Sequence, residues 1–81
     1  MMAEDKLLAR MKNNPRGAWR ISHVETLAKR YGFWIRRPGG GGSHLTLRHN
    51  SGAGLSVPAR RPIKPAYIRQ LVRLIEHLEE D

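Results

Sequence analysis

Residues 33–58 read FWIRRPGGGGSHLTLRHNSGAGLSVP, and apolar and polar side chains alternate in three short runs within them. Alternation with a period of two is typical of a strand that buries one face. The runs are 33–37, 44–49 and 54–57, separated by a four-glycine run and by an Asn-Ser-Gly turn signal. We therefore predict a three-stranded antiparallel meander, closed by Pro58, which cannot donate a ladder hydrogen bond.

Helical spacing of apolar residues flanks these strands on both sides. Residues 3–14 predict a short first helix. Next, Ser22 and Glu25 form the capping-box pattern of a helix start, and Gly32 is placed to end that helix. After the strands, Pro65 suits the first turn of a final helix, because its missing N–H is not needed there. The apolar stripe of this last helix is Ile68, Leu71, Val72, Ile75 and Leu78.

These elements predict an α+β fold in one domain, residues 1–81, since a chain of this length has room for one hydrophobic core. The expected order is helix, strand, strand, strand, helix. Two main helices cover one face of the sheet, and the helix at 3–14 is added to a core at 19–78. The other face of the sheet is expected to be open. By the alternation it carries Trp34, Arg36, His44, Thr46, Arg48 and Ser56.

The charge of the chain indicates a polyanionic partner. The formal net charge is +8, with 15 basic and seven acidic residues. Four of the acids stand at the C-terminal end, from Glu76 to Asp81, so residues 1–75 hold all 15 basic residues and only three acids. A compact domain with this excess attracts polyanions, of which nucleic acid is the commonest. We therefore favour a nucleic-acid partner. Acidic proteins, anionic membranes and a basic charge that serves only solubility are the alternatives that the charge leaves open.

Other classes of protein are disfavoured by what the chain lacks. It has no cysteine, so neither a disulfide nor a thiolate zinc site is expected. No apolar run approaches the ~20 residues of a membrane span, and the N-terminus lacks a signal-peptide pattern. The sequence predicts a soluble, cytoplasmic protein without a membrane partner.

His44 is the candidate catalytic residue. RNA carries a 2′-hydroxyl that can attack the neighbouring phosphate once a base removes its proton, and imidazole suits that role near neutral pH. His44 combines an outward strand position, a glycine-rich approach and nearby arginines. A lone strand histidine also has a purely structural interpretation. His49 points to the opposite face of its strand, so it cannot easily share a metal with His44. His23 and His77 are assigned structural roles near helix ends, and no metal site or cofactor is expected.

The candidate phosphate contacts surround His44. Gly42 either lets a phosphate approach closely or belongs to an ordinary surface loop, and Ser43 either donates a hydrogen bond to the phosphate or completes a turn. Trp34 either stacks on an unpaired base or is an ordinary core residue, whereas Trp19 is expected to pack. The cationic candidates are Arg36, Arg37, Arg48, Arg60, Arg61 and Lys64.

In combination these residues resemble the HicA toxins, mRNA interferases that pair with HicB antitoxins. The resemblance runs from about Trp19 to Leu78. Its motifs are Tyr-Gly-Phe at 31–33, Gly-Ser-His at 42–44, Arg-His at 48–49 and Leu-Ser-Val-Pro at 55–58. The chain departs from the family in its run of four glycines and in Leu45, where a further histidine is common.

The resemblance implies a fold like the double-stranded-RNA-binding domain. It also implies a toxin of a type II toxin–antitoxin system, a metal-independent endoribonuclease that cleaves mRNA with His44. A HicB-like antitoxin would cover His44 and the basic face. Two alternatives stay open: a non-catalytic RNA-binding module of the same fold, and a DNA-binding accessory factor. A His44→Ala variant separates the enzyme from the RNA-binding module.

Overall fold

The computed structural model describes residues 6–37, 44–59 and 62–79. Within these ranges the chain forms three helices and three strands, which is an α+β fold. The helices are α1 (Lys6–Asn13), α2 (Ile21–Arg30) and α3 (Pro65–Glu79). The strands are β1 (Trp34–Arg36), β2 (His44–Arg48) and β3 (Gly54–Pro58). The predicted order of elements is therefore confirmed.

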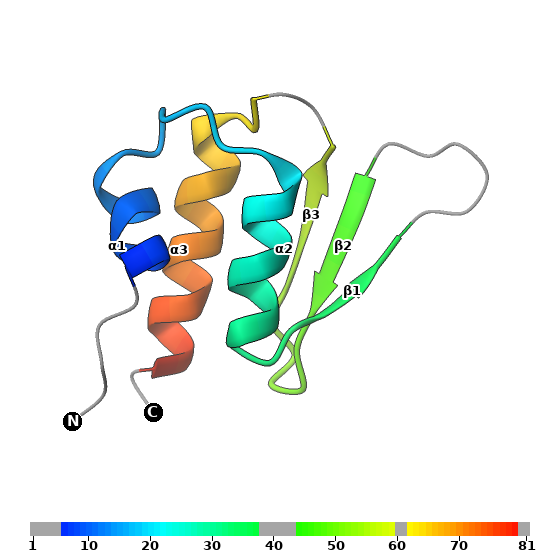
Figure 1. Ribbon diagram of the computed structural model, residues 1–81. Coiled ribbons are helices and arrows are strands. Elements are labelled where there is room, and N and C mark those ends of the chain that lie inside the picture. The colour runs from blue at the N-terminus through cyan, green and yellow to red at the C-terminus, as the bar shows by residue number, and fades with distance from the viewer. Residues whose placement is uncertain (1–5, 38–43, 60–61, 80–81) are drawn as a thin grey trace.

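The strands form one antiparallel sheet in the order β1-β2-β3, as the meander prediction requires. Figure 1 shows the helices together on one side of this sheet, with the other face uncovered. Helix α2 packs against β1, α3 packs against β3, and α1 packs against α3. The prediction of two main helices on one face of an open sheet is thus confirmed.

The hydrophobic core lies between the sheet and the helices. Leu45, Leu47 and Val57 enter it from the strands because the period-two alternation points them to the helix side. The tryptophan at 19 also packs there, and its indole N–H donates to the carbonyl oxygen of Asn14 at 2.7 Å. The buried residues are Met11, Trp19, Val24, Leu27, Ala28, Phe33, Leu45, Leu47, Val57, Ile63, Ile68, Leu71, Val72 and Ile75.

The predicted start of α2 is wrong. The helix begins at Ile21, so Ser22 lies inside its first turn and does not cap it. The acceptor at this end is His23, whose Nδ1 receives the backbone N–H of Arg20 at 3.0 Å. Glu25 pairs instead with the guanidinium of Arg37. The imidazole replaces the expected glutamate of the capping box, because it reaches the backbone N–H that precedes the helix.

The predicted end of α2 is confirmed. Gly32 has a φ of +84°, the left-handed conformation that glycine adopts without steric cost. The N–H of Gly32 donates to Lys29 and the N–H of Phe33 donates to Ala28, the pair of bonds that defines a Schellman motif. The side chains of Phe33 and Ala28, at the two positions where this motif usually has an apolar contact, are both buried. The chain therefore turns sharply from α2 into β1.

Candidate nucleic-acid interface on the open sheet face

The strand register brings the predicted surface residues together in cross-strand rows. Trp34 lies opposite Arg48, and Thr46 lies between Arg36 on one side and Ser56 on the other. Thr46 is half-buried and the other residues of the set are exposed. We call this surface the open face, and it consists of Trp34, Arg36, His44, Thr46, Arg48 and Ser56.

The rows of the open face are regularly spaced. Two residues along a strand span about 7 Å, so each row lies about that far from the next. His44 is in the first row with Pro58, Thr46 is in the second, and Arg48 with Trp34 is in the third. The imidazole, the two arginines and the indole are thus distributed along one surface about 13 Å long. Such a surface suits an extended polyanion better than a small molecule.

His44 is the first residue of β2 and its side chain is exposed. Its register partner is Pro58, whose ring offers neither a donor nor an acceptor. Within the described residues, no hydrogen bond or ion pair engages the imidazole of His44. The ring is consequently available to a ligand that approaches the open face.

Arg48 extends across the sheet toward β3. A Cβ placed on Gly54 would lie 3.6 Å from Cδ and 3.9 Å from Nη1 of Arg48. Because glycine has no side chain, the arginine can lie over this position. The guanidinium of Arg48 is therefore directed toward the outer edge of the sheet.

The open face is cationic. The two carboxylate side chains that the structure describes, those of Glu25 and Glu76, belong to α2 and α3 and not to the sheet. Arg36 and Arg48 therefore have no described carboxylate on their own face. Positive charges that lie together on one surface attract phosphate groups and increase the rate at which a phosphate-bearing ligand meets that surface.

Arg37 lies apart from the other cationic candidates. Its guanidinium pairs with the carboxylate of Glu25, and the side chains are 64% and 16% exposed, respectively. The charge of Arg37 is thus already partly balanced by α2. Lys64 is exposed just before α3. Gly42, Ser43, Arg60 and Arg61 lie outside the described residues, so the structure does not place them.

The other three histidines, all within the described ranges, have positions away from the open face. His23 accepts its backbone hydrogen bond at the start of α2 and packs edge-on against Trp19, with ring centroids 5.2 Å apart. His49 accepts the N–H of Ser51 and packs on Phe33 at 5.0 Å. His77 lies on α3 beside a groove. His44 alone of the four joins the open face.

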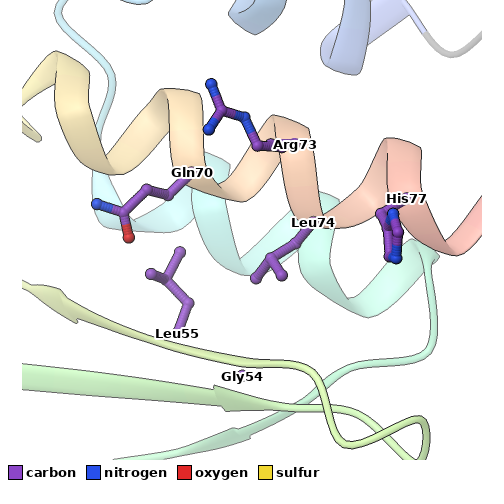
Figure 2. A pocket seen from close by; sticks show the side chains of 6 residues that line it. All are labelled: Gly54, Leu55, Gln70, Arg73, Leu74 and His77. Carbon is purple, nitrogen blue, oxygen red and sulfur yellow. The ribbon is translucent and has the colours of Figure 1, made fainter.

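A feature not predicted from the sequence is a groove between β3 and α3, with a volume of about 340 Å³. Figure 2 shows Leu55 rising from β3 toward the helix and Leu74 pointing from α3 toward the sheet. Residues 70, 74 and 77 recur at helical spacing, and that second stripe of α3 is the signal that could have revealed the groove. The residues that line this β3–α3 groove are Gly54, Leu55, Gln70, Arg73, Leu74 and His77.

In residues 6–37, 44–59 and 62–79, no three of the His, Asp and Glu side chains gather as metal ligands. Nor does any helix in these ranges have the length and apolarity needed to cross a membrane. No protein-family model, curated protein or solved structure matches the chain. The resemblance to HicA toxins stays a prediction from the residues.

Proposed function

We propose that this protein is a metal-independent endoribonuclease that cleaves mRNA in the cytoplasm, with His44 as its catalytic residue. The observation that carries the proposal is the exposed imidazole of His44 on a cationic surface that also presents the exposed indole of Trp34. A proton acceptor, phosphate-binding cations and a stacking surface are the parts that cleavage of a single-stranded RNA requires.

The proposed reaction uses the 2′-hydroxyl of the RNA itself. His44 takes the proton of this hydroxyl while its oxygen attacks the adjacent phosphorus. The bond to the 5′-oxygen breaks and that oxygen takes a proton from solvent water, so the products are a 2′,3′-cyclic phosphate and a 5′-hydroxyl end. Arg36 lies one row from His44 and Arg48 two rows away. These cations stabilise the negative charge of the phosphates that flank the reacting group.

The arrangement of helices and strands also supports the proposal. The main elements follow the order helix, strand, strand, strand, helix, and the two helices pack on one face of the antiparallel sheet. This order is the one expected of a HicA-like toxin with a fold like the double-stranded-RNA-binding domain. In that function the antitoxin partner is a HicB-like protein that covers His44 and the open face. An acidic surface on the partner would complement the net charge of +8.

A non-catalytic RNA-binding module is the second candidate, and one observation favours it. No described side chain accepts or donates a hydrogen bond that would orient the ring of His44. Catalytic imidazoles are commonly held by such a partner, which fixes the tautomer. In this alternative the open face binds RNA by shape and charge.

The deciding experiment incubates the purified protein and two variants with a long single-stranded RNA in excess EDTA. His44→Ala removes the proposed catalyst, and His77→Ala removes an exposed histidine of α3 as the matched control. We expect the native protein and His77→Ala to leave cyclic phosphate ends. We expect His44→Ala to bind the RNA and leave it intact.

Two results would contradict the proposal. If His44→Ala cleaves as fast as the native protein, His44 is not the catalytic residue. If the native protein binds tightly without cleaving, the protein is an RNA-binding module. In the first case, fragments without cyclic phosphate ends, read by mass spectrometry, would point to contamination by another nuclease.

A further inference from the structure

Strand β3 is an edge strand, and its outer backbone groups can be assigned from the register. The N–H of His49 donates to the carbonyl of Ala53, which marks this pair as hydrogen-bonded. Bonded and non-bonded pairs alternate in an antiparallel ladder, so Leu55 and Val57 direct their backbone groups to β2. The N–H and C=O groups of Gly54 and Ser56 therefore point outward. In the described part of the chain they have no partner.

The β3–α3 groove lies directly beside this edge. Leu55 and Leu74 are its apolar walls, and both are half-buried rather than fully covered. In Figure 2 the two leucines point toward each other, and Gly54 lies on the strand below them. A free strand edge next to an apolar groove is the combination to which extended peptides add as a further strand. The backbone of such a peptide would satisfy the outward groups of Gly54 and Ser56.

On the open face of the sheet, the outer edge of β3 is cationic. Arg48 lies over Gly54 and directs its guanidinium toward the edge. A strand paired with β3 would place every second side chain beside this guanidinium and the alternate ones beside Leu55 and Leu74. The occupant that fits both sides therefore alternates acidic and apolar residues.

We propose that the outer edge of β3 binds an extended acidic segment of a partner protein by strand addition. The net charge of +8 favours an acidic partner over a second copy of this basic chain, since two copies would repel. The proposal deepens the function proposed above and rests on it in one respect. Because Pro58 is the register partner of His44, a strand on this edge would lie beside the row of the catalytic imidazole and obstruct the approach of RNA.

The test uses a synthetic probe and no RNA. The probe is a seven-residue peptide that alternates glutamate and valine and is blocked at both ends. A peptide with lysine in place of glutamate is the control. We expect the glutamate peptide to bind the native protein in calorimetry and to shift the amide resonances of Gly54 and Ser56. The lysine peptide should not bind.

Two variants at one position separate strand addition from binding by charge alone. Ser56→Pro removes an N–H that points away from the ladder, a change that edge strands tolerate, and we expect affinity for the peptide to fall at least tenfold. Ser56→Ala keeps the N–H and should bind as the native protein does. If Ser56→Pro does not fold, Leu74→Glu serves instead, because its carboxylate opposes the peptide in the groove. It should cause a similar loss.

Three results would overturn the proposal. The first is equal affinity of Ser56→Pro and the native protein for the glutamate peptide. The second is a set of peptide-induced resonance shifts centred on β1 instead of β3. The third is a doubled mass of the protein in sedimentation, which would assign the edge to a second copy of the chain. The RNA assay is independent of this test. A protein that cleaves RNA but ignores the peptide retains the proposed function and loses only this binding surface.

Discussion

Trp34 and Arg48 lie directly opposite each other on β1 and β2, and both side chains are exposed on the open face. Side chains at such positions have Cβ atoms about 5 Å apart. Half of the surface of Trp34, 51%, is accessible, although tryptophan is usually largely buried. The guanidinium of Arg48 extends from this position away from β1, toward β3. An RNA strand that stacks one base on the indole and continues across the sheet would therefore bring a later phosphate to the cation.

The first prediction concerns Trp34. We expect Trp34→Ala to weaken binding of single-stranded RNA by about 1–3 kcal/mol, the usual contribution of one stacked base. Trp34→Phe should retain most of the affinity because the aromatic face is kept. The fold should be unaffected, since the indole is outside the core. Fluorescence anisotropy at fixed salt measures the effect, with a labelled 2′-O-methyl oligouridine, which the proposed reaction cannot cleave. Unchanged affinity in Trp34→Ala would show that RNA does not contact this part of the face.

The second prediction concerns Arg48. We expect Arg48→Ala to reduce the slope of log affinity against log salt by about 0.7, the value for one phosphate neutralised on a single strand. Arg73→Ala is the matched control, because Arg73 is an exposed arginine of α3 in the helical layer. It should leave the slope unchanged. The reverse pattern, with a loss at Arg73 only, would move the RNA interface to the helices.

The third prediction concerns the end of α2. In Gly32→Ala the new Cβ would lie 3.5 Å from Nε2 of His49, which is an ordinary contact. The loss of stability therefore arises from the positive φ of +84°, which alanine adopts only with strain. We expect the free energy of unfolding to fall by about 1–2 kcal/mol. Gly32→Asn should lose less, because asparagine adopts this conformation more readily. Urea denaturation followed by circular dichroism compares the three proteins. An alanine variant as stable as the native protein would contradict the assigned conformation.

The fourth prediction is a pH dependence at the contact of α1 with α3. The ammonium of Lys12 donates a hydrogen bond to the carboxylate of Glu76, and this bond and the charge attraction raise the pKa of Lys12 above its ordinary value of 10.5. A raised pKa means that the folded state binds the proton more tightly. The stabilisation is fully present below the unfolded-state pKa and is lost as the pH rises through the folded-state value.

Glu76→Gln provides the comparison for this effect. We expect the native protein to be slightly more stable than Glu76→Gln at pH 8, and the difference to disappear once the pH has risen through the folded-state pKa of Lys12, which lies above 10.5. The difference is small because both side chains are substantially exposed, at 58% and 38%. Urea denaturation of the two proteins across this range measures it. A difference that grows at high pH would contradict the assigned pairing.

The sheet and the last helix were predictable because their patterns follow directly from burial. Alternation in residues 44–48 determines which side chains enter the core, and the stripe of α3 determines which face packs. The open face follows from the same alternation, so His44 and its neighbours were assigned correctly to it. The alternation determines which side chains lie on the open face, whereas the ligand of that face is inferred from the chemistry of those side chains.

The start of α2 and the β3–α3 groove were not predictable in the same way. Ser22 and Glu25 match a capping pattern, but the pattern does not reveal that His23 can reach the same N–H from inside the helix. The groove depends on how far α3 lies from β3, which is a tertiary relationship. Similarly, the ion pair of Arg37 with Glu25 joins residues from different parts of the fold, and no local sequence pattern predicts it.

The attachment of α1 has a consequence for chemical reactivity. This eight-residue helix is too short to persist alone, and Met11 is its one buried residue within the described range. Helix α1 is held to the rest of the chain by its packing on α3 and by the ion pair of Lys12 with Glu76, a residue 64 positions away in the sequence. We therefore expect α1 to detach transiently while the sheet and the other helices stay folded, so that its amide hydrogens exchange early. Only in that opened state can oxidants reach the thioether of Met11, and the polar sulfoxide that forms would prevent the helix from docking again.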